Sequence, residues 1–341
     1  MSANRLLDVT DLKVHFALDE GTVRAVDGVS FHVEEGEIVG VIGESGCGKS
    51  VTAQAIMRIV PQPGRIVSGK ILLRGDGNGA DDLAGLDDRG KRIRGIRGGT
   101  ISMIFQEPMT SFSPVYTIGN QISEAARIHR GMDKRQARAL TAEMLNKVGI
   151  PRPSERLDSY PFQLSGGMRQ RAMIAMALCT NPRILIADEP TTALDVTIQA
   201  QILDLIRSLQ QEMGMSVLLI SHDLGVIAEM CHRVAVMYLG RIVESGTVQS
   251  VFERPSHPYT QALMNSMPKM SRRAGDLSVI RGSVPNPFER VSGCPFHPRC
   301  EHIMSGRCDQ GRPPDRVLVG ENHHAACLLH APTEAREGGR T

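Results

Sequence analysis

Residues 43–50, GESGCGKS, have the spacing G-x-x-x-x-G-K-[ST] of a phosphate-binding loop. Glycines at this spacing let backbone N–H groups curl around phosphate oxygens, and the following helix adds the positive end of its dipole. Lys49 would reach the β- and γ-phosphates, and the Ser50 hydroxyl would bind Mg²⁺. The loop lies between a predicted strand and the helical pattern SVTAQAIMRIV, so a chance glycine-rich turn is the weaker alternative. The residues predicted to contact the nucleotide are Gly43, Glu44, Ser45, Gly46, Cys47, Gly48, Lys49, Ser50 and Val51.

Two adjacent carboxylates, Asp188 and Glu189, follow an apolar run in the stretch ILIADEP. An acidic residue at the tip of a buried strand is what a phosphate-binding loop needs to hold Mg²⁺, and we expect Asp188 to do so through water. Glu189 is placed to orient or deprotonate the attacking water. Paired carboxylates at a strand end can also be ordinary loop solvation, but the loop upstream favours the catalytic interpretation.

The stretch LSGGMRQR, residues 164–171, supplies a second small anion cradle at the start of a helix. One chain needs one cradle for a γ-phosphate, so the second predicts a head-to-tail dimer with ATP between the subunits. Together with the phosphate-binding loop and ILIADEP, this segment resembles the signature of the ATPase subunits of ATP-binding cassette (ABC) transporters. The resemblance implies that the following residues face the ATP of the partner subunit: Leu164, Ser165, Gly166, Gly167 and Gln170.

Four further positions match the cassette one by one. Phe16, 27 residues before Gly43, is similar to the aromatic that stacks on adenine, although a strand Phe often packs in a core. Gln106 in MIFQEP resembles the glutamine that senses Mg²⁺ and the attacking water. Asp195 in TALD resembles the residue that crosses the dimer interface, and His222 the histidine that contacts the γ-phosphate. The resemblance therefore implies catalysis by Glu189, His222 and Gln106, with Mg²⁺ held by Ser50, Gln106 and Asp188.

Cys47 stands where Ser or Ala is more familiar in this loop. Only its backbone is needed, so we expect activity to survive. A partly exposed thiol near Lys49 and a helix N-terminus would have a lowered pKa, and we expect it to be sensitive to alkylation.

The surrounding pattern indicates how these residues are positioned. Residues 5–42 alternate apolar and polar positions and predict short strands, and residues 119–149 show helical periodicity. From residue 165 the pattern alternates helix (166–180), buried strand (183–188), helix (196–213), buried strand (216–221) and helix (222–231), with strands near 234–248. Such alternation predicts a mostly parallel sheet covered on both faces.

The expected fold class is therefore α/β. The resemblance implies a P-loop NTPase cassette with a mixed β-sheet core, an antiparallel β subdomain and an α-helical signature subdomain. We place the nucleotide-binding domain at residues 1–254, with the helical subdomain at about 107–180. Beyond Pro255 long periodicity disappears while Pro, His, Cys and Arg increase, so residues 255–341 are interpreted as a small, irregular, Cys-rich extension.

The composition of the 341 residues is that of a folded soluble protein, with 41% hydrophobic and 22% charged residues. Trp is absent, aromatic residues make up 4%, and the net charge is only +2, so a nucleic-acid partner is disfavoured. The N-terminus has no apolar core of a secretory signal, and no apolar run reaches the roughly 18 residues of a membrane span. We expect any membrane role to come through a partner.

Three stretches narrow the resemblance to oligopeptide and dipeptide importers: FQEPMTSFSPVYTIGNQI, HPYTQALMNSMP and GSVPNP followed by GCPFHPRC. That family implies a second, related ATPase subunit, two transmembrane permeases and an extracytoplasmic peptide-binding protein. It also implies a peripheral location at the cytoplasmic face of the cell membrane. Relatives that move nickel, glutathione or sugars remain open as alternatives, and a soluble cassette ATPase acting on DNA or ribosomes is less favoured.

Four of the seven cysteines gather at one end, with the spacing C-x₅-C-x₇-C-x₁₈-C: Cys294, Cys300, Cys308 and Cys327. The absence of a signal segment indicates a reducing compartment, where a disulfide framework is the weaker interpretation. Four thiolates can hold Zn²⁺ or an iron–sulfur cluster, and free thiols in a loose tail are a third possibility. The resemblance favours a structural [4Fe–4S] cluster over Zn²⁺. A role as a redox or metal sensor with incidental ATPase activity is a weaker alternative.

Overall fold

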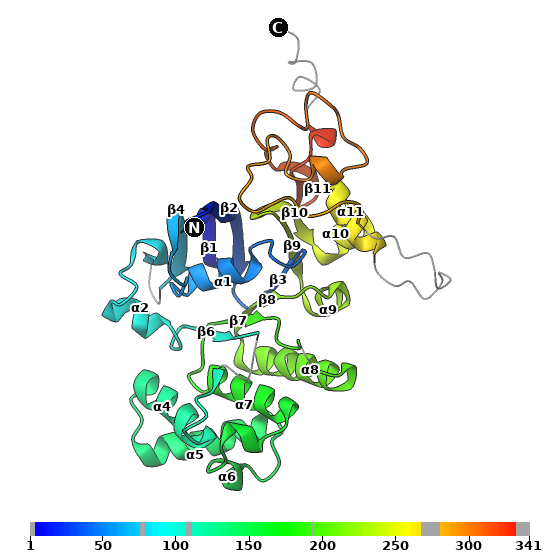
Figure 1. The fold of residues 1–341 in the computed structure, drawn as a ribbon. Coiled ribbons are helices and arrows are strands. Elements are labelled where there is room, and N and C mark those ends of the chain that lie inside the picture. Colours follow the sequence, from blue (N-terminus) through cyan, green and yellow to red (C-terminus); the bar gives the residue numbers. More distant parts are fainter. Residues whose placement is uncertain (1–3, 76–78, 107–110, 193, 267–279, 332–341) are drawn as a thin grey trace.

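The computed structural model describes residues 4–75, 79–106, 111–192, 194–266 and 280–331. Near the N-terminus, four antiparallel strands form one sheet in the order β2-β1-β4-β5. Its long members are β1 (Arg5–Leu18), β2 (Gly21–Glu34) and β4 (Gly64–Arg74), and β5 (Ala80–Asp82) forms the edge. Figure 1 shows this sheet above helix α1 (Lys49–Ile56). The antiparallel subdomain expected of a cassette is therefore present.

A second sheet has eight strands in the order β11-β12-β10-β9-β3-β8-β7-β6. Its centre, from β9 to β6, is parallel, while β10, β12 and β11 pair antiparallel. The strand bounds are β3 (Ile38–Ile42), β6 (Ile101–Ile104), β7 (Ile184–Asp188), β8 (Ser216–Ile220), β9 (Arg233–Tyr238), β10 (Arg241–Thr247), β11 (Val317–Gly320) and β12 (His323–Ala325).

Every residue of β3, β7 and β8 is buried, as the continuous apolar runs predict for strands covered on both faces. Successive side chains point to opposite faces. In β7, Ile184 and Ile186 pack with the antiparallel sheet, whereas Leu185 and Ala187 pack with the helices. Because this strand is fixed on both faces, the carboxylates that follow it have a defined position.

The helical subdomain lies between β6 and β7 in the sequence and at the far end from the extension in Figure 1. The single periodic stretch 119–149 forms two helices, because Gly131 adopts a φ of +63° and Asp133 begins a new helix with a capping box. The helices of this region are α4 (Ile118–Arg130), α5 (Lys134–Lys147), α6 (Pro153–Arg156) and α7 (Gly166–Leu178).

The remaining helices are α2 (Lys91–Ile96), α8 (Val196–Met213), α9 (Leu224–Met230), α10 (Val248–Glu253) and α11 (Pro258–Asn265). None of the helices within the described residues is both long and apolar enough to cross a bilayer.

The C-terminal extension packs on the cassette. Its strand β12 pairs with β10, so it extends the main sheet, which the irregular sequence did not predict. Cys294, Phe296 and Cys308 belong to the same hydrophobic cluster as the strands and helices of the cassette. A buried network joins the two parts: the Glu244 carboxylate accepts hydrogen bonds from the Ser256 and His257 backbone N–H groups and lies 2.7 Å from the His323 ring.

Candidate ATP site

The phosphate-binding loop connects the end of β3 to the first residue of α1, as predicted. Gly43 and Gly48 have φ values of +154° and +102°, which L side chains rarely adopt. A Cβ on either would lie 2.1 Å from a carbonyl oxygen, that of Met237 or Ala25 respectively. The Lys49 ammonium is buried and donates to the carbonyls of Gly43 (2.8 Å) and Glu44 (3.1 Å). The loop thus curls around the lysine that the sequence assigned to the phosphates.

The expectation that the Cys47 thiol is partly exposed and has a lowered pKa was wrong. Its side chain is only 4% exposed, with its sulfur 2.7 Å from the position that a Cβ on Gly43 would take. Burial raises the pKa of this thiol, and the nearby Lys49 opposes the effect only in part. The sequence shows that Lys49 and a helix N-terminus lie near Cys47, but it does not show that the loop folds over the thiol and buries it.

Ser50 and Asp188, 138 residues apart, meet at the start of α1 and the end of β7. The Ser50 hydroxyl donates to the Asp188 carboxylate at 3.0 Å. Burial raises the pKa of Asp188, and the Ser50 hydrogen bond acts in the opposite direction. A hydroxyl and a carboxylate are oxygen groups of the kind that Mg²⁺ binds in proteins, so these two side chains could hold the ion.

Glu189 lies at the centre of the predicted catalytic residues. Its carboxylate oxygen Oε2 is 3.0 Å from Gln106 Nε2 and 3.2 Å from His222 Nδ1. The Thr192 hydroxyl also donates to this oxygen at 2.9 Å. This contact was not predicted, although the sequence shows a hydroxyl three residues after Glu189. Glu189 has a φ of +46°, and such strained backbone in a non-glycine residue is concentrated at functional sites.

The signature segment begins α7. Ser165 is its N-cap and accepts a hydrogen bond from the Met168 N–H at 3.3 Å, while Ser165 and Gly166 are exposed and Leu164 is buried beneath them. Gly167 is half-buried. The exposed helix start is free to meet an anion from outside the chain.

Gln170 departs from its expected role. It is only 2% exposed, and its amide donates to the Pro190 carbonyl at 2.5 Å. The side chain therefore points into its own chain and joins α7 to the loop after Glu189, instead of facing a partner's nucleotide. Asp195 is exposed, as an interface residue must be, and caps α8 by accepting from the Ile198 N–H at 3.0 Å.

Phe16 lies in β1 opposite Val23 of β2 and Gly64 of β4. It is half-buried, and its ring packs against Gly64, since a Cβ there would lie 2.5 Å from a ring carbon. Part of the ring is thus supported by the sheet and part remains accessible.

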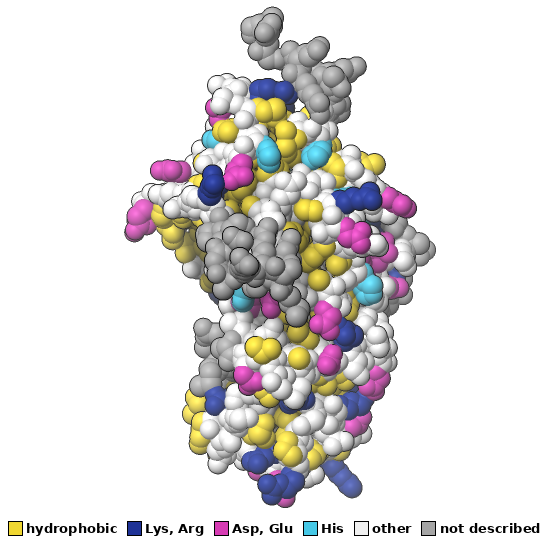
Figure 2. Space-filling model, turned by 90° about the vertical axis from the view of Figure 1, so that its right-hand side faces the viewer, with side chains coloured by type: hydrophobic (Ala, Val, Ile, Leu, Met, Phe, Trp, Pro, Cys, Tyr) yellow, Lys and Arg dark blue, Asp and Glu magenta, His cyan; other side chains and the backbone are white. Residues whose placement is uncertain are grey.

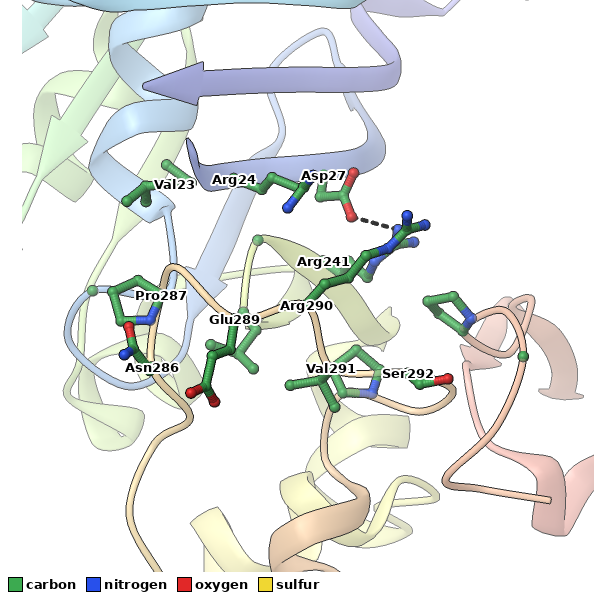
Figure 3. Close-up of a pocket in the computed structure, with 17 residues that line it drawn as sticks. Val23, Arg24, Asp27, Arg241, Asn286, Pro287, Glu289, Arg290, Val291 and Ser292 are labelled. Carbon is green, nitrogen blue, oxygen red and sulfur yellow. Dashed lines mark hydrogen bonds and ion pairs between the residues drawn. The ribbon is translucent and has the colours of Figure 1, made fainter. Parts of the chain in front are cut away.

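A cavity of about 390 Å³ runs from Gly46 of the phosphate-binding loop along β2 to Val23, the cross-strand neighbour of Phe16. Figure 3 shows its opposite wall, which consists of a segment of the C-terminal extension that includes Asn286, Pro287 and Arg290. Since the loop is the predicted phosphate contact and Phe16 the predicted base contact, this cavity borders the path that a nucleotide would take between them.

The four clustered cysteines line one small cavity, together with His257, His297 and His302. None of the seven cysteines, all of which the structure describes, forms a disulfide. Burial, followed by the mutual repulsion of the thiolates, raises the pKa of Cys294 to about 12; burial also raises that of Cys327 to about 11. Over the described ranges, no group of three or more His, Cys, Asp or Glu side chains is arranged to hold a metal ion.

Residues 26–192 match the ABC transporter family, and residues 243–308 match the C-terminal region of oligopeptide/dipeptide transporters. A probable peptide ABC transporter ATP-binding protein of Sinorhizobium fredii is 52% identical over 95% of both chains. The dipeptide transport ATP-binding proteins DppD of Bacillus subtilis and Escherichia coli are 48% and 45% identical, and the matches span at least 95% of each chain.

Two solved structures share the fold. The dimeric ATP-binding cassette MJ0796 in a post-hydrolysis state with ADP and Pi has a TM-score of 0.62 at 26% identity, covering 71% of this chain and 98% of that one. The protein cbiO1 of Clostridium perfringens, part of the ABC transporter complex cbiONQ, has a TM-score of 0.60 at 27% identity, covering 74% of this chain and 92% of that one. The chain therefore belongs to the ATP-hydrolysing subunits of ABC transporters, in the oligopeptide/dipeptide family.

Proposed function

We propose that this ATPase drives the import of di- or oligopeptides through a membrane ABC transporter. The observation that carries the proposal is that one chain brings Ser50 to Asp188 and Gln106 to Glu189 and also has a C-terminal region that matches peptide transporters. The relatives with the same two parts bear names of peptide or dipeptide transport proteins.

In the proposed mechanism, Glu189 is the general base for the attacking water. The Gln106 amide and the His222 ring, both within 3.2 Å of its carboxylate, orient that water and the γ-phosphate. Ser50 and Asp188 would hold Mg²⁺, which neutralises charge on the phosphates. Replacement of Glu189 by Gln tests this assignment, because it should abolish most ATP turnover while ATP binding is retained.

A second ATPase subunit would complete the site. The helix start at Ser165 and Gly166 is exposed, as is Asp195, and in a head-to-tail dimer each would meet the nucleotide or loop of the partner. ATP then joins the subunits, and hydrolysis separates them by removing the γ-phosphate that both sides contact, a ligand-driven shift between two states. We propose a related but distinct chain as this partner.

The permeases would dock on the helical subdomain. Val115, Tyr116 and Phe162 are 70%, 59% and 67% exposed, which is unusual for side chains of this size. The two segments that carry them are tied by a hydrogen bond from the Ile118 backbone N–H to the Ser159 carbonyl. A permease helix inserted here would hold the chain at the cytoplasmic face of the membrane, and an external peptide-binding protein would deliver the solute.

We further propose that the four clustered cysteines hold a structural [4Fe–4S] cluster, with Zn²⁺ as the alternative. The type of donor supports either group, since four cysteines without disulfides line one cavity beside the core of the extension, although these side chains are not arranged around a common metal position in the described residues. Burial raises the pKa of Cys294 and Cys327, and a bound cation would favour their ionised form. Anaerobic purification should yield iron with acid-labile sulfide; zinc alone would contradict the cluster.

The solute is tested with the assembled importer. Peptide presented by the binding protein should stimulate ATP turnover, whereas stimulation by nickel or glutathione alone would assign the chain to a related importer. A nucleic-acid ATPase is not favoured, because acidic and basic side chains are interspersed on the face in Figure 2 and the net charge is +2.

A further inference from the structure

Glu44, the residue after the first glycine of the phosphate-binding loop, has all of its polar groups engaged. Its carbonyl accepts from the Lys49 ammonium at 3.1 Å. Its backbone N–H donates to the Tyr259 hydroxyl at 2.9 Å, and its carboxylate pairs with Arg299. Two of these three groups are therefore held by residues that lie more than 200 positions away, both in the C-terminal extension.

The Arg299 guanidinium is built into the protein for this contact. Its side chain is 3% exposed, and its Nη1 and Nη2 atoms reach the two carboxylate oxygens of Glu44 at 2.7 and 3.0 Å. Its Nε donates to the Arg281 carbonyl, and its carbon centre lies 5.8 and 5.9 Å from the ring centroids of Tyr238 and Phe296. A two-pronged ion pair with a buried guanidinium and a partly exposed carboxylate fixes geometry as well as adding energy.

We propose that Arg299 is a positioning residue for ATP binding: through the Glu44 carboxylate it fixes the first turn of the phosphate-binding loop. That turn carries the two carbonyls that hold the Lys49 ammonium, so its position sets that of the lysine. The same extension forms the second wall of the cavity beside Gly46 (Figure 3). This inference adds to the ATPase assignment, which does not depend on it.

The position of Arg299 in the extension gives the contact a second consequence. Arg299 and Phe296 lie between Cys294 and Cys300, and the backbone N–H of Arg299 donates to the Phe296 carbonyl. The Arg299 side chain therefore links the conformation of the loop between Cys294 and Cys300 to that of the phosphate-binding loop.

The test is Arg299→Met in the full-length chain, which keeps much of the side-chain volume but removes the charge. ATP affinity is measured by titration calorimetry in the Glu189→Gln background, and KM and kcat for ATP in the assembled importer. We expect the Kd and KM for ATP to rise at least about fivefold while kcat changes by less than about twofold. Arg299→Lys, which keeps the charge, should recover part of the affinity.

The matched control is Arg281→Met, which removes an arginine of the same extension whose side chain is 83% exposed. We expect no change in the Kd or KM for ATP with this variant. A purely structural role for Arg299 would lower the melting temperature of the Arg299→Met chain while leaving its Kd and KM for ATP unchanged, and that result would overturn the proposal. If the Arg299→Met chain does not fold, Tyr259→Phe serves as the second variant, because it removes only the hydroxyl that accepts from the Glu44 N–H. An unchanged Kd for ATP in that variant would also overturn the proposal. Absence of ATP hydrolysis in the unsubstituted importer would instead contradict the ATPase assignment.

Discussion

Replacing Gly48 by Ala should damage the ATP site far more than replacing Gly46 by Ala. Both glycines belong to the phosphate-binding loop and have positive φ values, +102° and +78°. They differ in their surroundings: a Cβ on Gly48 would lie 2.1 Å from the Ala25 carbonyl oxygen, whereas a Cβ on Gly46 would meet no atom within 4 Å. The pair therefore separates the cost of the backbone conformation from the cost of the steric overlap.

The left-handed conformation alone costs an alanine about 1 kcal/mol, which is our expectation for Gly46→Ala. In Gly48→Ala the distance between the new Cβ and the Ala25 carbonyl oxygen must increase by about 0.9 Å to reach the 3.0 Å below which Cβ contacts are essentially never seen. This oxygen belongs to the backbone of β2 and cannot rotate away as a side chain could. Overpacking of this kind costs a further ~1–3 kcal/mol, so the free energy of unfolding should fall by about 3 kcal/mol. A displacement near 1 Å in the loop should also lower kcat/KM for ATP about 100-fold.

Urea unfolding of the purified full-length chain measures the first quantity, and ATP turnover by the assembled importer measures the second. Equal losses of stability and of kcat/KM in the Gly46→Ala and Gly48→Ala chains would refute the argument, because it assigns most of the effect to the contact with Ala25.

Three further predictions follow from other contacts. Ser50→Ala removes the hydroxyl bonded to Asp188, so the Mg²⁺ concentration for half-maximal ATPase activity should rise about tenfold; an unchanged Mg²⁺ requirement would remove Ser50 from the metal site. Cys47 should resist iodoacetamide in the native chain and react after unfolding in urea, as followed by peptide mass spectrometry, because burial raises its pKa; rapid labelling without urea would contradict this. Burial, and next the guanidinium of Arg233 3.0 Å away, lower the pKa of His32 from 6.5 to about 4. Between pH 6.5 and pH 4, therefore, His32 gains a proton in the unfolded chain but not in the folded one. Stability present above pH 6.5 is therefore lost towards pH 4, and the melting temperature of His32→Gln should fall less over that range than that of the parent; parallel curves would exclude His32 as the cause.

The sequence predicted the elements whose signal is local. The phosphate-binding loop, ILIADEP and the signature each lie within about ten residues, and their positions between strand and helix follow from apolar patterns. Parallel pairing then brings Asp188 to Ser50, because neighbouring parallel strands end at the same edge of the sheet. The position of each motif could therefore be predicted from its own neighbourhood, and the meeting of Asp188 and Ser50 from the expected parallel sheet.

The features that the sequence missed depend on residues far apart in the chain. The burial of Cys47 depends on the close packing of the loop against β9, and the inward direction of Gln170 depends on the carbonyl of Pro190. The pairing of Glu44 with Arg299 joins positions 255 residues apart. Neither charge alone predicts that it will find the other, since both residue types are usually exposed.

The central claim is that Glu189 activates the water that hydrolyses ATP. Glu189→Gln preserves the size of the side chain and an oxygen for the contacts to Thr192 and Gln106, but removes the base. We predict that ATP turnover by the assembled importer falls about 10²- to 10⁴-fold while the Kd for ATP changes by less than about twofold. Turnover equal to that of the unsubstituted importer would contradict the account.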